Sequence, residues 1–263
     1  LDLTKILCDE KDIKLDESKF TILMDKQKER ARKKQKFAIN KKNVNWKIFE
    51  EVDEAEYAPY KESSIKTQIY GYSKNDDFVY ILLKKTPFYF ESGGQISDIG
   101  TIQNENITLD VLDVQKIDDK ICHICKIIDG KMDSYAKDFV IAAIDLERRK
   151  KIMSNHTATH LLHRALKNVL GDHVQQAGSL VSDKKLRFDY THSQRISDSD
   201  INLIETEINE VIKKNFSLNK EIIPYDVAIA DGAEALFGEK YGDFVRVVSI
   251  SDYSKELCGG THV

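Results

Sequence analysis

The sequence predicts an α+β protein made of a helical N-terminal segment, a small β-barrel-like subdomain and a final α/β subdomain. Three observations support this. Residues 1–43 contain neither glycine nor proline and space their apolar residues as a helix does. Residues 44–144 carry short runs rich in β-branched and aromatic residues between turn residues. Residues 145–263 alternate helical with strand-like runs, and 263 residues are enough to bury about two cores.

Composition excludes several classes of protein. Apolar residues make up 41% of the chain and charged residues 32%, which is ordinary for a globular protein and too apolar for a disordered one. No apolar run approaches the roughly 20 residues of a membrane helix, so no membrane partner is expected. The formal net charge of −4 excludes a uniformly basic coat for nucleic acid. Composition does not predict the oligomeric state.

The cysteine content and the first residues bear on the cellular setting. Four cysteines are too few for a disulfide framework in a chain of this length, which predicts a reducing, cytoplasmic location. The opening "LDLTKILCDE" has neither an initiator Met nor a signal-peptide layout, so we expect a piece of a longer chain. The cysteines are Cys8, Cys122, Cys125 and Cys258.

The first segment, 1–43, is expected to be helical. Phe20, Leu23 and Met24 follow helical spacing, and the stretch 26–36 then carries seven basic residues against one acidic residue. A charge run of this kind is most often a solvated helix face. The alternative is contact with a phosphate backbone, which Arg and Lys along one helix can follow.

The second segment, 44–144, is expected to form a small barrel or sandwich. Asparagine- and aspartate-rich turns at 75–77 and 104–106 separate its strand-like runs. Because no second CxxC occurs, Cys122 and Cys125 are interpreted as buried strand cysteines and not as half of a zinc ribbon. The runs are "SIKTQIYGYS", "DFVYILLKK", "FYFESGGQISDIGTI", "ITLDVLDVQKI" and "KICHICKII".

The third segment, 145–263, begins with a long helix. Asp145 is a credible N-cap and Gly171 a credible stop, while Ser154-Asn155 could break the helix or lie within it. A strand at "LRFDYTH" follows, then a helix at "DSDINLIETEINEVIKKN" and a strand at "DFVRVVSI". One apolar stripe is expected on that second helix, formed by Ile201, Ile204, Ile208, Val211 and Ile212.

Two arginine groups in this segment could contact phosphate, but we favour structural roles for them. Arg187 is expected to pair with Asp189 on the exposed face of its strand, and Arg148 and Arg149 are expected to make similar intramolecular contacts.

Two pairs of residues suggest a metal site. His156 and His160 stand four apart on the long helix and therefore share a face. Cys258 and His262 are also four apart, with two glycines between them that allow a tight turn. Three nitrogens and a sulfur suit one tetrahedral zinc ion. His163 is interpreted as a neighbour of the site or a surface residue.

The sequence leaves the use of such a site open. If all four side chains bind, the ion is saturated and orients a substrate or holds the fold. If only three bind, a water takes the fourth position and can be activated. Thr157 follows His156 where zinc peptidases carry Glu, which argues against a peptidase. The alternative to a metal site is a buried pair of histidines with an unrelated thiol nearby.

These motifs resemble the editing domain of alanyl-tRNA synthetases, which is shared with the free-standing AlaX proteins. The similarity lies in "SNHTATHLLHRAL", "HVQQAGSLVSDKKLRFDYTH" and "ELCGGTHV", and "TPFYFESGGQISDIGTI" resembles the glycine-rich motif of the barrel part. It covers about residue 45 to the end. The leader "LDESKFTILMDKQKERARKKQK" resembles the end of the tRNA-recognition region, which AlaX proteins lack, so a fragment of a synthetase is favoured.

The resemblance implies hydrolysis of mischarged Ser-tRNA(Ala) and Gly-tRNA(Ala) at the aminoacylated 3′ end, with ATP-dependent ligation left to the parent chain. It implies one zinc ion held by His156, His160, Cys258 and His262. It implies roles in catalysis or substrate discrimination for Thr159, Gln176, Gly93, Gly94 and Gln95. It divides the chain into a tRNA-recognition or linker segment (1–43), a barrel-like subdomain with the glycine-rich motif (44–144) and a zinc-binding editing subdomain (145–263).

Two departures and two alternatives accompany this interpretation. Asp252 stands where the family has glycine, and the family continues past Val263, so closing secondary structure is expected beyond it. The alternatives are a non-catalytic, zinc-stabilised RNA-binding module and a free-standing AlaX-type protein.

Overall fold

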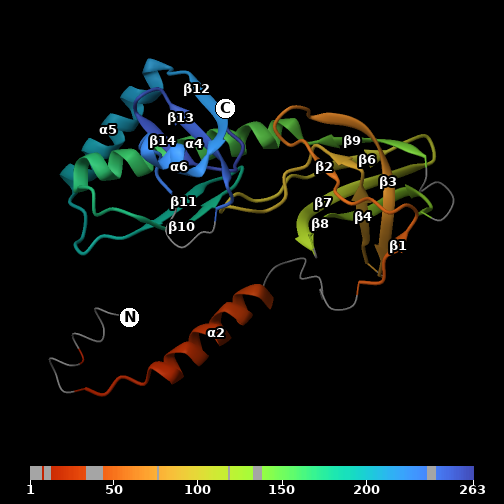
Figure 1. Cartoon of the computed structure of the whole chain (residues 1–263), viewed down its shortest axis with the longest axis horizontal. Coiled ribbons are helices and arrows are strands. Elements are labelled where there is room, and N and C mark those ends of the chain that lie inside the picture. The colour runs from red at the N-terminus through yellow and green to blue at the C-terminus, as the bar shows by residue number, and fades with distance from the viewer. Residues whose placement is uncertain are drawn as a thin grey trace. The chain divides into compact units, whose positions relative to one another are not determined.

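A computed structural model describes residues 8, 13–33, 44–75, 77–117, 119–132, 138–235 and 241–263. The chain divides into two compact units, Leu1–Val44 and Asn45–Val263. The described residues are α+β, as predicted, with four helices and a closed antiparallel barrel (Figure 1). No helix among them is both long and apolar enough to cross a lipid bilayer.

The first unit contains the helix α2 (Glu17–Lys33). Asp16 caps it, since its Oδ1 accepts a hydrogen bond from the Lys19 backbone N–H at 2.9 Å. Phe20, Leu23 and Met24 lie in this helix, as their spacing predicted, and all three side chains are exposed. The end of the predicted basic stretch, residues 34–36, lies outside the described residues.

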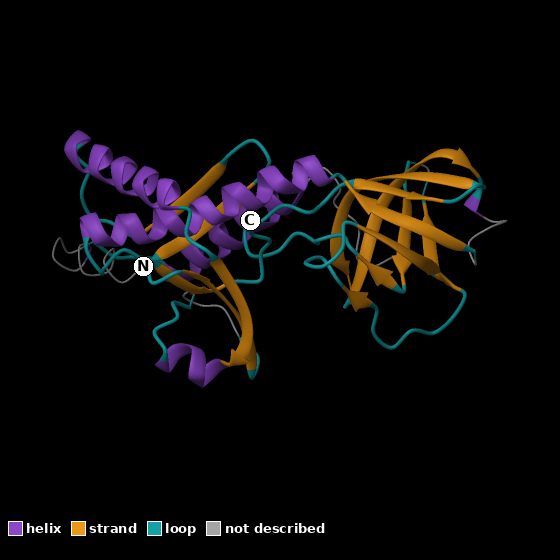
Figure 2. Ribbon diagram, turned by 90° about the horizontal axis from the view of Figure 1, so that it is seen from above, coloured by secondary structure: helices purple, strands orange, loops and turns teal. Residues whose placement is uncertain are grey.

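The second unit contains a barrel of six antiparallel strands, because β9 pairs with both β6 and β3 and closes the sheet. A two-stranded parallel pair, β2 (Glu56–Tyr57) and β5 (Lys85–Thr86), lies outside that ring, and β1 (Lys47–Ile48) pairs antiparallel with β3. Of the two predicted architectures the barrel is confirmed (Figure 2). Its strands in spatial order are β3 (Ser64–Lys74), β4 (Val79–Leu83), β8 (Lys120–Gly130), β7 (Ile107–Ile117), β6 (Gly100–Gln103) and β9 (Phe139–Ile144).

The barrel interior explains the apolar runs of the sequence. Every residue of β4 is buried, and alternate residues of β7 point inward to the core. Cys122 and Cys125 are fully buried strand residues, as predicted. Burial raises the pKa of the Cys125 thiol well above its ordinary value, as expected for a thiol packed in the apolar core of the barrel.

One predicted strand run is largely wrong. Of "FYFESGGQISDIGTI", only its last three residues, 100–102, join a barrel strand, and residues 87–99 form a loop whose Phe88 packs into the barrel core. Within that loop a tight turn is closed by reciprocal backbone hydrogen bonds between Ser92 and Gln95. Gly93 and Gly94 take positive φ angles of 56° and 78°, which residues with side chains rarely adopt, so the glycine pair allows the turn.

The long helix α4 (Leu146–Leu170) leaves β9 after a single residue, Asp145. Asp145 is the predicted N-cap and accepts from the Arg148 backbone N–H, while Gly171 is the predicted C-cap. The helix is continuous through Ser154-Asn155, so the break that the sequence allowed does not occur. One continuous helix therefore runs from the barrel into the rest of the unit.

A second helix, α5 (Asp198–Lys214), packs along α4 and is capped by Ser197. Its predicted apolar stripe is only partly buried. Ile204 and Val211 reach the core, whereas Ile201 and Ile212 are exposed because both lie at the same margin of the stripe, away from Val211.

Two small sheets complete the unit. The predicted strands β11 (Leu186–Tyr190) and β13 (Phe244–Ile250) are present, but the elements beside them were not predicted. The neighbouring elements are β10 (Gln176–Val181), which pairs with β11, and β12 (Leu218–Pro224) and β14 (Ser254–Leu257), which flank β13, together with the short helix α6 (Tyr225–Ala230).

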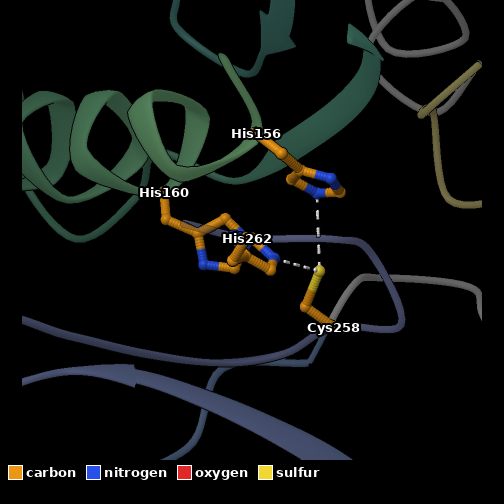
Figure 3. A group of neighbouring side chains, drawn as sticks. All are labelled: His156, His160, Cys258 and His262. Atoms are coloured by element: carbon orange, nitrogen blue, oxygen red, sulfur yellow. Dashed lines mark hydrogen bonds between the residues drawn. The ribbon is translucent and has the colours of Figure 1, made fainter. Parts of the chain in front are cut away.

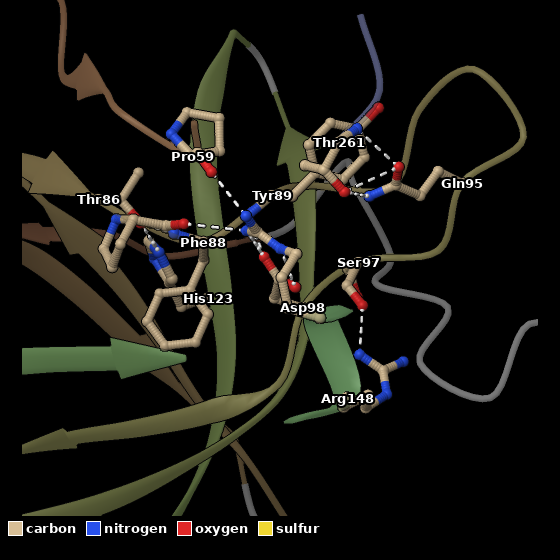
Figure 4. Close-up of polar contacts among 12 residues, drawn as sticks. Pro59, Thr86, Phe88, Tyr89, Gln95, Ser97, Asp98, His123, Arg148 and Thr261 are labelled. Atoms are coloured by element: carbon tan, nitrogen blue, oxygen red, sulfur yellow. Dashed lines mark hydrogen bonds and ion pairs between the residues drawn. The ribbon is translucent and has the colours of Figure 1, made fainter. Parts of the chain in front are cut away.

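A buried ion pair joins α4 to the loop 87–99. Arg149 Nε donates to Asp98 Oδ1 at 2.8 Å, and Arg149 Nη2 bonds the second carboxylate oxygen. The remaining donors reach the carbonyls of Pro59 (2.6 Å) and Pro87 (3.2 Å), and Figure 4 shows the contacts around Asp98 and Pro59. Both charged side chains are almost completely buried. The structural role predicted for this arginine is confirmed, as is the Arg187–Asp189 pair at 3.1 Å.

Candidate metal centre

Four side chains from two distant parts of the chain converge at one point (Figure 3). His156 and His160 come from α4, and Cys258 and His262 from the segment after β14. Their ligand atoms all lie within 4.8 Å of one another. The Cys258 Sγ is 3.4 Å from His156 Nε2 and 3.3 Å from His262 Nε2. Tetrahedral bonds of about 2.0 Å to nitrogen and 2.3 Å to sulfur require N···S edges of roughly 3.5 Å.

The tight turn at Cys258–His262 depends on glycine and on one arginine. A Cβ at Gly260 would lie 2.0 Å from the His156 ring, so no other residue fits there. The Gly260 backbone N–H donates to Cys258 Sγ at 3.3 Å. From β13, Arg246 Nη1 donates to the carbonyls of Cys258 (2.6 Å) and Gly260 (2.9 Å) and holds the turn against the sheet.

Gln95 fixes the orientation of His156. Its Oε1 accepts from the Thr261 backbone N–H at 2.9 Å, which determines which end of the amide faces the site (Figure 4). The same oxygen lies 2.7 Å from His156 Nδ1, so Nδ1 carries the proton and Nε2 keeps its lone pair toward Cys258. The predicted residue Gln95 is thus fully buried behind a ligand.

The other two imidazoles are arranged in the same way. His262 Nδ1 lies 3.2 Å from the Thr157 hydroxyl, and His160 Nδ1 faces Glu256 Oε2 at 3.7 Å. Each ring therefore directs Nδ1 outward and leaves Nε2 for the centre, a common arrangement for histidine ligands. Sequence reasoning missed Glu256. Its position two residues before Cys258 on a strand could have indicated that it shares the ligand's side of the sheet.

His163 lies next to the cluster and contacts it through Glu256. Its Nδ1 lies 3.2 Å from Glu256 Oε1, and it is not one of the four converging ligands. The sequence interpretation of His163 as a neighbour of the site is confirmed, since the Glu256 carboxylate stands between it and His160.

Burial and charge set the protonation of the cluster. Burial raises the pKa of Cys258, but the neighbouring histidines, above all His160, lower it by more, so that it falls well below its ordinary value and the sulfur is a thiolate. Burial lowers the pKa of His160, while Glu256 and Cys258 raise it more, to about 9. Burial lowers the pKa of His262 to about 3, so that this ring is neutral.

The donor set fits a single metal ion. The three histidines are at most 5% exposed, and the ligand atoms of all four side chains lie close enough to share one ion. A thiolate and three imidazole nitrogens held this close, away from water, gain most from a shared cation. The cluster can therefore hold a metal ion.

A cavity of about 340 Å³ opens beside the cluster and unites most of the predicted residues. His156, His160 and Cys258 line one wall, and Gly93, Thr159 and Gln176 line others. The Thr159 hydroxyl donates to the Asn155 carbonyl at 2.8 Å, and Gln176 Nε2 donates to the Ser179 hydroxyl at 3.2 Å. The barrel loop and the helical half thus share one cavity.

Gly94 allows the barrel loop to approach β10. A Cβ at Gly94 would lie 2.8 Å from the Ser179 carbonyl oxygen, so only glycine permits this contact. Backbone hydrogen bonds from Val181 to Gly94 (2.7 Å) and from Ile96 to Val181 (3.1 Å) then join the loop to the hairpin. Of the five residues predicted to act on substrate, Gly93, Thr159 and Gln176 line the cavity, whereas Gly94 and Gln95 support its walls.

Two known families match the sequence. The family described as tRNA synthetases class II (A) matches residues 1–183. The family described as threonyl and alanyl tRNA synthetase second additional domain matches residues 245–263, which include Cys258 and His262.

Individual relatives agree with this. The chain is 43% identical over 276 residues to the alanine--tRNA ligase of Thermoanaerobacter sp. (strain X514). It is 42% identical over 278 residues to that of Clostridioides difficile (strain 630), and 43% identical over 270 residues to that of Francisella philomiragia. All of the chain is covered in each case, but it spans only 31% of the length of these relatives.

Proposed function

The chain belongs to the class II (A) tRNA synthetases, its whole length matching part of alanine--tRNA ligases, and from this premise we propose that it contains a proofreading site. The proposed reaction is hydrolysis of the ester in mischarged Ser-tRNA(Ala) and Gly-tRNA(Ala). One observation carries the proposal: the metal cluster shares a cavity with Gly93 of the barrel loop and with Thr159 and Gln176. We attribute ATP-dependent ligation to other parts of the parent protein.

Zinc is the metal we propose, held by His156, His160, Cys258 and His262. Three imidazoles and one thiolate at these separations match its preferred ligands and tetrahedral geometry. When bound, zinc supplies a fixed positive charge beside the ester, whether all four side chains or only three coordinate it.

Proofreading answers a limit on selectivity in any pocket built for alanine. Glycine is smaller and fits such a pocket, and one missing methyl group changes binding by only about 1–3 kcal/mol. An apolar pocket also excludes the added hydroxyl of serine poorly. A second site that hydrolyses the wrong products is the physical remedy.

The cavity side chains can make this second site selective. Thr159 and Gln176 offer a hydroxyl and an amide to the serine hydroxyl, and alanine would leave them partly unpaired at a cost of about 1–3 kcal/mol. Glycine is admitted by its small size. In this proposal, backbone N–H groups stabilise the negative oxygen that forms when water attacks the ester.

The domain organisation belongs to the same proposal. Residues 1–43, with α2 and the basic stretch, would form the end of a tRNA-recognition region. Residues 44–144 would form the barrel subdomain with the glycine-rich motif, and residues 145–263 the zinc-binding editing subdomain. The expected partner is the aminoacylated 3′ end of tRNA(Ala).

Deacylation assays test the proposed function. The chain should release serine and glycine from Ser- and Gly-tRNA(Ala) and spare Ala-tRNA(Ala), and a zinc chelator should stop the reaction. Binding of Ser-tRNA(Ala) without release of serine would instead establish a non-catalytic RNA-binding module. Equal rates with and without bound metal would refute the role of the cluster.

Gln95→Leu should weaken zinc binding by about 10–100-fold, because outer contacts to histidine ligands contribute on that scale. Leucine cannot accept from His156 Nδ1 or from the Thr261 N–H, so the ring loses its fixed orientation. Competition with a chromophoric chelator measures the affinity. Gln103→Leu, at an exposed position on β6, is the matched control, and unchanged affinity in Gln95→Leu would contradict the assignment.

Zinc affinity should rise about tenfold per pH unit from neutrality to about pH 9 and then level off. The His160 imidazole, with a pKa of about 9 in the metal-free protein, must lose its proton to bind zinc, so raising the pH removes the competitor. Calorimetric titration in buffers of different ionisation enthalpy should detect about one proton released per zinc ion at pH 7.5. Binding that does not change across this range would contradict the prediction.

A further inference from the structure

An exposed apolar face lies on the strands beside the cavity. The two most exposed large apolar side chains among the described residues are Ile222 (71%) and Phe244 (68%). The register of β12 and β13 pairs Ile222 with Arg246 and Pro224 with Phe244. Directly paired residues point to the same face, as do residues two apart on a strand. Ile222, Phe244 and Arg246 therefore share one face of the sheet.

This face borders the metal cavity. Phe244 and Arg246 line that cavity, and Arg246 also lines a neighbouring cavity of about 290 Å³ together with Tyr60 and Lys220. The Arg246 guanidinium lies 4.4 Å from the centre of the Tyr60 ring, which is itself 47% exposed. Lys220 Nζ donates to the His262 carbonyl at 3.0 Å. Aromatic rings and cations thus alternate around the opening.

Exposed aromatic rings next to Arg and Lys suit single-stranded nucleic acid. Each unpaired base offers a flat face that stacks on an aromatic ring, and the cations attract the phosphates between the bases. A double helix hides those base faces, so it could use the cations but not Phe244. The combination therefore favours unpaired nucleotides over duplex.

We propose that the face formed by Phe244, Ile222 and the Arg246–Tyr60 pair binds the unpaired 3′-terminal nucleotides of an RNA. The inference rests on the proposed function, which requires an amino acid ester at the end of an RNA strand to enter the metal cavity. A base stacks on Phe244 at the opening, and the adjoining phosphates lie near Arg246 and Lys220. The surface therefore guides the strand end to the metal.

Binding of two uncharged RNA hairpins to the zinc-loaded chain tests this surface. The hairpins share one stem, and only one carries four unpaired 3′ nucleotides. The chain should bind the tailed hairpin more tightly. Phe244→Ala should weaken that binding by about 10–100-fold and leave binding of the blunt hairpin and the zinc content unchanged. Phe244→Trp, which keeps a stacking ring, should retain the preference for the tail.

Phe139→Ala supplies the matched control. Phe139 is 55% exposed on the barrel strand β9 with the Lys66 ammonium 4.8 Å from its ring centre, and it lines neither cavity. This variant should bind both hairpins as the unchanged chain does.

Three outcomes would overturn the assignment. They are unchanged binding of the tailed hairpin by Phe244→Ala, equal losses for tailed and blunt hairpins, and dissociation of a dimer by this substitution in sedimentation, which would make the face a protein interface. Deacylation is measured separately. A chain that binds the tail through Phe244 and hydrolyses no ester would refute the proposed function and still support this surface.

Discussion

Cys258→Ala is expected to reduce zinc affinity by roughly 10²–10³-fold and to abolish release of serine from Ser-tRNA(Ala). Four-ligand zinc sites in small domains bind with about 10–16 kcal/mol. Loss of one ligand in four removes about 3–4 kcal/mol, which corresponds to that change in affinity. The Cys258 sulfur is also the atom that both His156 and His262 approach within 3.4 Å, so its loss separates the two pairs.

Metal content after gel filtration, zinc competition and single-turnover deacylation measure this effect. Cys122→Ala removes a fully buried thiol in the barrel and should leave zinc content unchanged. If Cys258→Ala still held one zinc ion per chain and deacylated Ser-tRNA(Ala) at an undiminished rate, both the ligand assignment and the proposed reaction would be contradicted.

Asp98→Ala is expected to lower the free energy of unfolding by about 3–5 kcal/mol. The substitution leaves the buried guanidinium of Arg149 without its counter-charge, and an unpaired buried charge is much more costly than the loss of a surface ion pair. Asp98 also accepts from the Tyr89 backbone N–H at 2.7 Å, so the loop 87–99 loses a second contact.

Urea unfolding followed by circular dichroism measures this loss. Glu147→Ala is the control, because its ion pair with Lys150 lies on the surface of the same helix and should contribute less than about 1 kcal/mol. The double variant Asp98→Leu/Arg149→Met should recover part of the stability, since no charge is then left buried. A loss below 1 kcal/mol in Asp98→Ala would contradict the role of the pair.

Local sequence signals predicted the helix and the cluster of four candidate metal ligands well. Asp145 and Gly171 mark the ends of α4 through capping, which depends only on neighbouring residues. The helical period then places His156 and His160 on one face, and two glycines allow Cys258 and His262 to face them. Each inference needed only a few consecutive residues.

The contacts between distant segments could not be predicted. Gln95 reaches His156 across 61 residues, and nothing in either motif specifies that hydrogen bond. The aromatic residues before Gly93 suggested a strand, but the backbone leaves the sheet because two adjacent glycines adopt positive φ and the loop is held by Asp98 and Arg149. Tertiary contacts override strand propensity there.

The missed strands have a similar explanation. In β12 (Leu218–Pro224) and β14 (Ser254–Leu257) lysine and glutamate weaken the apolar alternation, and β14 is only 4 residues long. Both form because β13 lies between them and satisfies their backbone hydrogen bonds. The exposed face on β12 and β13 followed from this register and not from the sequence.

The amide of Gln95 behind the His156 ring has a consequence for dissecting the protein. A piece cut before α4 would carry all four candidate ligands and could still capture an ion. It would lack the side chain that holds one imidazole in place, and also the cavity wall at Gly93. Metal binding by such a fragment would therefore not show that its site is complete. Building the same site into another protein requires the barrel loop as well as the four ligands.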